Sequence, residues 1–172
     1  AGAWTRFWSP QDDPLFPIFL GSQGMYSSLE DYAKFMQLWL NKGRVDRQRV
    51  LRARSVRKAL TPGPHPMRGP TSLPELETAY GRQMQLWTAP VEGGEDGERE
   101  VVVFGHTGSD GTHAWVFPEK RAMVLYFTQS RMNSTGLRVE EVLGDLMMGV
   151  PYDANQDAPP FEQYLGYYWE GE

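Results

Sequence analysis

The sequence predicts a single α+β domain in which one antiparallel sheet of about four strands is flanked by helices. Amphipathic helical segments lie before and after a run of short β-branched and aromatic segments, and tight turns join those segments. The length of 172 residues suits one hydrophobic core, and 40 % of the residues are hydrophobic. We therefore expect a globular chain with a meander at its centre.

The first helix is predicted over residues 28–42. Serines at 27 and 28 followed by acids at 30 and 31 form an N-terminal capping pattern. Gly43 is expected to supply the left-handed residue that stops the helix. The apolar residues recur at helical spacing: Leu29, Tyr32, Ala33, Met36, Trp39 and Leu40.

Two further helices are expected. A short one is predicted from Ser55 to Leu60, opened by Ser55, and the five prolines of residues 61–74 then predict a long exposed loop. The last helix is predicted over residues 135–149, where an apolar stripe can lie on the sheet: Leu137, Val139, Val142, Leu143, Leu146 and Met147.

Four strands are predicted between these helices. Tyr80–Thr88 and Glu100–Phe104 are joined by the glycine-rich turn of residues 93–97. His113–Phe117 and Ala122–Thr128 are joined by the turn of residues 118–121. These short connections favour antiparallel neighbours.

The sharpest local feature is Phe104–Gly111, in which three glycines surround two hydroxyls and a histidine beside an apolar strand. Glycine at such positions permits close approach of the backbone to a ligand. A triad of His106, Ser109 and Asp110 is sterically awkward, because neighbouring strand residues point to opposite faces. This segment is therefore a candidate for close contact with a ligand.

Several segments together resemble the end of the class C β-lactamase and esterase family of serine hydrolases, which includes penicillin-binding-protein-like enzymes and D-aminopeptidases. They are Gly24–Phe35, Gly105–Gly108, Trp115–Glu119 and Met123–Gln129. The resemblance covers residues 21–150 in the family's order. It implies the C-terminal part of a β-lactamase/transpeptidase-like fold over residues 1–150. Residues 151–172, with an aromatic stretch after two prolines, then read as a linker and the start of a possible appended segment.

The resemblance also implies roles for the motif His106, Thr107 and Gly108. In the family this strand carries Lys-Thr-Gly or His-Thr/Ser-Gly opposite the nucleophile, so His106 and Thr107 would contact substrate or tune the charge of the site. The backbone N–H of Ser109 would be one of two oxyanion-hole donors. The implied substrates are β-lactams, D-amino peptides or small esters and amides, and histidine in place of lysine favours an esterase or a peptidase.

The family's nucleophile motif, Ser-x-x-Lys, has no convincing counterpart. Ser55 and Lys58 match the spacing, but their segment resembles a structural helix of the family, in which Ser55 would be the N-cap. Tyr26–Ser28 resembles a non-catalytic look-alike of the tyrosine motif. The chain is thus expected to be part of a serine hydrolase and inactive alone, with the N-terminal part of the domain as its partner. A non-catalytic ligand-binding homologue, or a subunit that associates with a chain carrying the nucleophile, remain alternatives.

Other classes of function are disfavoured by composition. The net charge of −5, with both signs interspersed, argues against nucleic acid, and no apolar run is long enough for a membrane span. The absence of cysteine excludes disulfides and thiol catalysis. Three histidines without metal spacing predict no metal, and no cofactor motif is found. Residues 1–6 do not resemble a signal peptide and suggest a cut chain, while the family resemblance favours a periplasmic or secreted setting.

Overall fold

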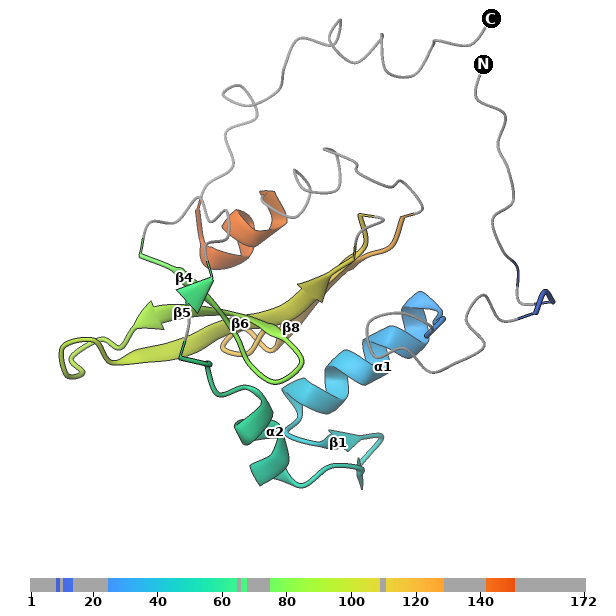
Figure 1. The fold of residues 1–172 in the computed structure, drawn as a ribbon, viewed down its shortest axis with the longest axis horizontal. Helices are drawn as coiled ribbons and strands as arrows, with labels where there is room; N and C mark the ends of the chain where they lie inside the picture. The colour runs from blue at the N-terminus through green and yellow to red at the C-terminus, as the bar shows by residue number, and fades with distance from the viewer. Residues whose placement is uncertain are drawn as a thin grey trace, which may run out of the picture. The chain divides into compact units, whose positions relative to one another are not determined.

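The computed structural model describes residues 9, 11–13, 25–64, 66–67, 75–108, 111–128 and 142–150. A compact unit spans Ser28–Tyr152. Within it, helices pack against an antiparallel sheet, so the predicted α+β class is confirmed (Figure 1).

Helix α1, Leu29–Leu40, begins where the capping pattern predicts. Ser28 is its N-cap, and the Ser28 hydroxyl accepts a hydrogen bond from the Asp31 backbone N–H at 3.1 Å. The apolar stripe buries Met36 and Trp39 completely or nearly so. The polar face carries an ion pair between Lys34 and Asp31, 2.8 Å apart.

The C-terminus of α1 differs from the prediction by one residue. The Gly43 N–H donates to the Leu38 carbonyl at 2.7 Å and the Lys42 N–H to the Trp39 carbonyl at 3.1 Å, which is a Schellman motif. The residue that first enters the left-handed region is therefore Lys42, with φ 53°. Gly43 follows at φ 94°, and a Cβ there would collide with the Leu51 carbonyl oxygen.

A small hairpin that the sequence did not predict follows α1. Strands β1, Arg44–Val45, and β2, Gln48–Arg49, pair antiparallel around a two-residue turn. Both turn residues, Asp46 and Arg47, have positive φ, as a type I′ hairpin turn requires.

Helix α2, Ala53–Ala59, corrects the predicted role of Ser55. Its N-cap is Arg52, which makes no side-chain capping hydrogen bond, and Ser55 lies within the first turns. Ala53 and Arg54 are good helix formers, so the helix extends two residues upstream of the serine.

The main sheet has six strands in sequential order, each antiparallel to the next. They are β3 (Pro66–Met67), β4 (Glu77–Tyr80), β5 (Gln85–Pro90), β6 (Arg99–Thr107), β7 (His113–Phe117) and β8 (Ala122–Tyr126). The pairing of β5 with β6 and of β7 with β8 confirms the two predicted hairpins.

Two expectations about the sheet are wrong. The segment predicted as one strand, Tyr80–Thr88, contains the end of β4 and most of β5, separated by a turn in which the Gly81 N–H donates to the Met84 carbonyl at 2.9 Å. Strand β3 lies within the proline-rich segment predicted as loop, and Pro66 stands at the outer edge of the described sheet. An edge strand tolerates proline because its N–H is not needed for the ladder.

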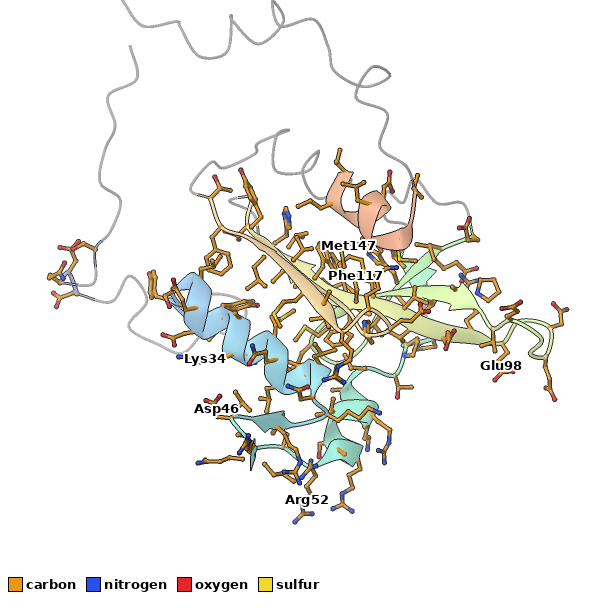
Figure 2. The ribbon with its side chains drawn as sticks, turned by 180° about the vertical axis from the view of Figure 1, so that it is seen from behind. Lys34, Asp46, Arg52, Glu98, Phe117 and Met147 are labelled. Atoms are coloured by element: carbon orange, nitrogen blue, oxygen red, sulfur yellow. The ribbon has the colours of Figure 1, made fainter. Side chains whose placement is uncertain are left out.

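The two faces of the sheet bury separate cores. One core joins α1 and α2 to the sheet and includes Met36, Val56, Leu86, Phe104 and Val116. The other is built on Val103, Trp115 and Phe117, with Met147 and Met148 packed against it. These methionines belong to a helix over residues 142–148, which covers the face opposite α1 (Figures 1 and 2). Its predicted beginning, residues 135–141, lies outside the described residues.

Candidate active site

The β6–β7 hairpin carries the His-Thr-Gly motif at one end of the sheet. Thr107 pairs with His113 in the ladder, and the Gly108 N–H donates to the Thr112 carbonyl at 2.7 Å. The Gly111 N–H then donates to the Gly108 carbonyl at 3.1 Å, which closes the turn. Ser109, predicted to supply an oxyanion-hole donor, lies outside the described residues, as does Asp110.

The glycines of this hairpin meet protein neighbours. A Cβ on Gly105 would collide with the Ala114 carbonyl oxygen and the Trp115 ring, and one on Gly108 with the Thr112 hydroxyl. The sequence had suggested room for a ligand at these positions. In the structure, Gly105 and Gly108 are needed for close packing of β6 against β7.

His106 is held at both ring nitrogens. Its Nε2 lies 2.6 Å from the Tyr80 hydroxyl, and its Nδ1 lies 2.6 Å from the Thr107 carbonyl oxygen. The two rings are tilted by 57° with centroids 5.6 Å apart. A carbonyl oxygen only accepts, so Nδ1 carries the proton, and Nε2 of the neutral ring accepts from the Tyr80 hydroxyl. The half-buried imidazole is thereby fixed in one tautomer and one orientation.

Tyr80 is the site residue that sequence reasoning missed. It ends β4, and the register places it opposite Gln85, which is itself opposite Gly105 on β6. Tyr80 on β4 is therefore aligned, across β5, with Gly105 on β6, the residue that precedes His106. The glycine after Tyr80 was the available signal, since a turn there brings the end of β4 beside the motif.

His113 occupies a different environment. It is 3 % exposed, stacks on Tyr126 at 5.2 Å with an interplanar angle of 27°, and its Nε2 has no hydrogen-bond partner among the described residues. Burial lowers the pKa of His113 from its ordinary value. These features agree with the predicted role of a sheet residue.

Ser55 and Lys58, which match the spacing of the nucleophile motif, do not form a catalytic arrangement within the described residues. Ser55 and Lys58 are exposed on α2, and neither side chain makes a hydrogen bond or ion pair in the described part of the chain. Helix α2 instead uses Val56 and Ala59 for burial in the core. Tyr26 is 49 % exposed just before α1, where Ser28 serves as the helix cap.

Within the described ranges, no group of three or more His, Asp or Glu side chains is arranged to hold a metal ion. The helices of this part of the chain are also too short or too polar to cross a bilayer.

The described residues thus form a helix-flanked antiparallel meander that carries the His-Thr-Gly segment in its β6–β7 hairpin. The family model described as Beta-lactamase matches residues 1–143, and the chain belongs to this family. This match supports the assignment of the chain to the superfamily of β-lactamase-like and penicillin-binding-protein-like serine hydrolases. A search of curated proteins finds no match to the chain.

Proposed function

We propose that this chain contributes one wall of a serine hydrolase site that works through an acyl-enzyme, and that the nucleophile is supplied by residues other than those of the chain. The observation that carries the proposal is the fixed imidazole of His106 at the end of β6, beside the turn that leads to Ser109. In this proposal Ser109 supplies one oxyanion donor. Esters, amides, β-lactams and D-amino peptides are the substrate classes that the chemistry fits.

The hydrogen bonds of His106 define how it would act. Both nitrogens of the neutral ring are engaged, so a substrate meets the remaining acceptor capacity of the Tyr80 hydroxyl oxygen before it meets the imidazole. Tyr80 is thus a positioning residue for His106. A hydroxyl that donates to an imidazole is also polarised towards binding an N–H or O–H group of a ligand.

The case for an external nucleophile rests on Ser55. A serine that forms an ester needs a base within hydrogen-bond reach. Lys58 makes no such bond, and α2 packs on the core through the opposite residues Val56 and Ala59. Among the described residues, Ser55 is therefore a surface serine.

The proposal is tested by intact-mass spectrometry after incubation with a fluorophosphonate and, separately, with a reactive β-lactam. We expect no stoichiometric adduct on the 172-residue chain or on its Ser55→Ala variant. The complete product of the gene should carry one adduct on a serine outside the chain. An adduct on Ser55 that the variant loses would make Lys58 its base and overturn the external nucleophile.

A second measurement separates the hydrolase from a ligand-binding homologue. In the complete gene product, His106→Ala should slow acylation by about 3- to 10-fold, the worth of the one neutral hydrogen bond that positions the Tyr80 hydroxyl. His106→Lys, the family's other residue at this position, should recover part of the rate. A complete product that forms no adduct with either reagent would instead favour a non-catalytic homologue that binds a ligand at the same wall.

A further inference from the structure

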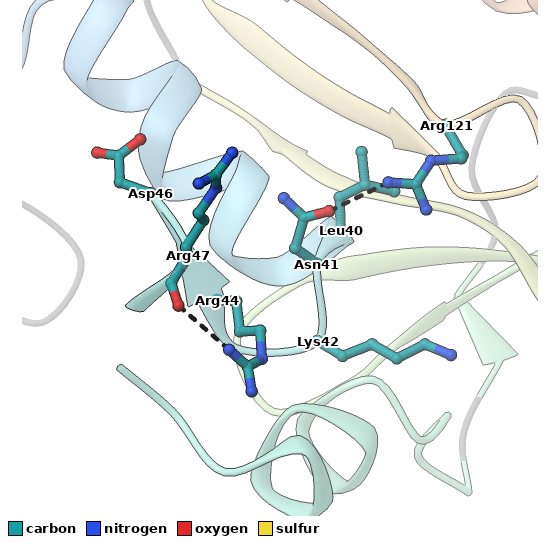
Figure 3. Close-up of a pocket in the computed structure, with 7 residues that line it drawn as sticks. All are labelled: Leu40, Asn41, Lys42, Arg44, Asp46, Arg47 and Arg121. Carbon is teal, nitrogen blue, oxygen red and sulfur yellow. Dashed lines mark hydrogen bonds between the residues drawn. The ribbon is translucent and has the colours of Figure 1, made fainter. Parts of the chain in front are cut away.

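A second site candidate lies at the other end of the sheet from His106. A pocket of about 430 Å³ opens where the C-terminus of α1, the β1–β2 hairpin and the β7–β8 turn meet (Figure 3). The His-Thr-Gly hairpin joins β6 to β7, whereas this pocket is bounded by Arg121 after the opposite end of β7. The pocket is therefore separate from the candidate active site.

The lining of this pocket is strongly basic. Lys42, Arg44, Arg47 and Arg121 line it together with one acid, Asp46. None of the four cations forms an ion pair within the described ranges, although the whole chain carries a net charge of −5. The C-terminus of α1 contributes only about half a negative charge, so the pocket remains positive.

The backbone conformation of the pocket does not favour Lys or Arg, because positive φ favours glycine. Lys42, Asp46, Arg47 and Arg121 are the four non-glycine residues with positive φ in the described part of the chain, and all of them line this pocket. They come from three different turns, in each of which glycine would be the relaxed choice. Three of the four, Lys42, Arg47 and Arg121, are long cationic side chains, which are thus placed at a conformational cost and gathered at one location.

Two of the guanidinium groups are oriented by neutral oxygens. The Arg44 Nη1 donates to the Arg47 carbonyl at 3.1 Å, and the Arg121 Nη2 lies 3.4 Å from the Asn41 Oδ1 (Figure 3). A guanidinium has five N–H donors, so each group retains donors for a ligand. Such forks match the oxygens of phosphate and carboxylate groups.

We propose that this pocket binds a small multivalent oxyanion, whose phosphate or carboxylate groups are held by the guanidinium groups that line it. The volume accommodates a ligand larger than one phosphate group. The inference does not depend on the proposed hydrolase activity, because it uses none of the residues of the His-Thr-Gly wall.

Isothermal titration of the chain with pyrophosphate and, separately, with citrate tests the proposal. The variants are Arg47→Gly and Arg121→Gly, with Arg82→Gln as a control that removes an exposed charge outside the pocket. Each glycine variant should weaken binding by at least about tenfold, whereas the control should bind as the parent does. Because glycine relieves the left-handed backbone, the midpoint of thermal unfolding should be unchanged or higher in both variants.

The two titrants distinguish the sources of the oxyanion. Tighter binding of pyrophosphate assigns the site to phosphorylated ligands, and tighter binding of citrate assigns it to polycarboxylates. The proposal is overturned if neither binds more tightly than about 1 mM at low ionic strength. It is equally overturned if Arg82→Gln weakens binding as much as the pocket variants do, since that result indicates non-specific attraction.

Discussion

Replacing Tyr80 with phenylalanine removes one hydroxyl from the candidate active site and leaves the ring in place. That hydroxyl is 2.6 Å from His106 Nε2, while the Thr107 carbonyl holds Nδ1 at the same distance. In the Tyr80→Phe variant, His106 Nε2 no longer accepts a hydrogen bond from the hydroxyl of residue 80. The imidazole then depends on a single hydrogen bond for its orientation.

The magnitude follows from the burial of the pair. A hydrogen bond between neutral groups contributes about 0.5–1.5 kcal/mol net, and a fully buried acceptor left unsatisfied costs about 1–3 kcal/mol. His106 is only half-buried, so water can replace part of the lost bond. We expect the free energy of unfolding to fall by about 1 kcal/mol.

Tyr126→Phe is the matched control, because Tyr126 stacks on the buried His113 and no hydrogen bond of its hydroxyl is present in the described part of the chain. Its free energy of unfolding should change by less than about 0.5 kcal/mol. Both variants are compared by urea unfolding followed by circular dichroism. Nitrogen NMR of the parent chain should find the proton of neutral His106 on Nδ1.

Two results would refute this reasoning. One is an equal loss of stability in Tyr80→Phe and Tyr126→Phe, which would mean that the bond to His106 contributes nothing particular. The other is a proton on Nε2 in the neutral ring of the parent, since Nδ1 would then face the Thr107 carbonyl oxygen without a hydrogen.

Three further predictions concern stability. Lys42→Gly should raise the free energy of unfolding by about 0.5–1 kcal/mol, because it relieves the left-handed residue of the Schellman motif. Gly43→Ala should lower the free energy of unfolding by more than about 1 kcal/mol, because its Cβ would collide with the Leu51 carbonyl oxygen. Urea unfolding measures both changes. Gly105→Ala should destabilise the chain by about 2 kcal/mol or more because its Cβ meets the Ala114 backbone, and should lower the thermal midpoint. Burial lowers the pKa of His113, so the unfolded chain takes up that proton first, and stability should fall as the pH drops below the ordinary value of 6.5. His113→Phe should flatten this part of a stability curve measured between about pH 5 and 8, and an unchanged slope would contradict the assignment.

The elements that local chemistry defines were predictable from the sequence. The cap at Ser28, the apolar stripe of α1 and the turn of residues 118–121 lie where their patterns indicate. Strands β6, β7 and β8 also follow from their apolar runs. Each of these features depends on residues within a few positions of one another.

The features that the sequence analysis did not predict correctly depend on contacts formed in the folded chain. Alternation continues through Tyr80–Thr88, so nothing in its periodicity marks the turn that separates β4 from β5. Strand β3 and the β1–β2 hairpin are two residues per strand, which is too short for a pattern. Ser55 has the chemistry of a cap but stands three residues after Arg52, the observed N-cap of α2.

The candidate site was predictable only in part. His106, Thr107 and Gly108 were identified from the motif, and the structure places them at the end of β6 and in the turn that follows. Their proposed roles remain predictions. The contact between Tyr80 and His106 joins residues 26 positions apart, and it could not be found while β4 and β5 were read as one strand.

The sequential strand order has a consequence for how the chain folds. Each strand from β4 to β8 pairs with the strand that precedes it in the chain, so the main sheet requires no closure of a long loop. Such local pairing lowers the contact order and favours rapid formation of the hairpins one after another. The two helical layers that cover the sheet come from opposite ends of the compact unit, and their docking is the step that closes the largest loop. We therefore expect the hairpin that carries His106 to form before α1 and the 142–148 helix settle on either side of it.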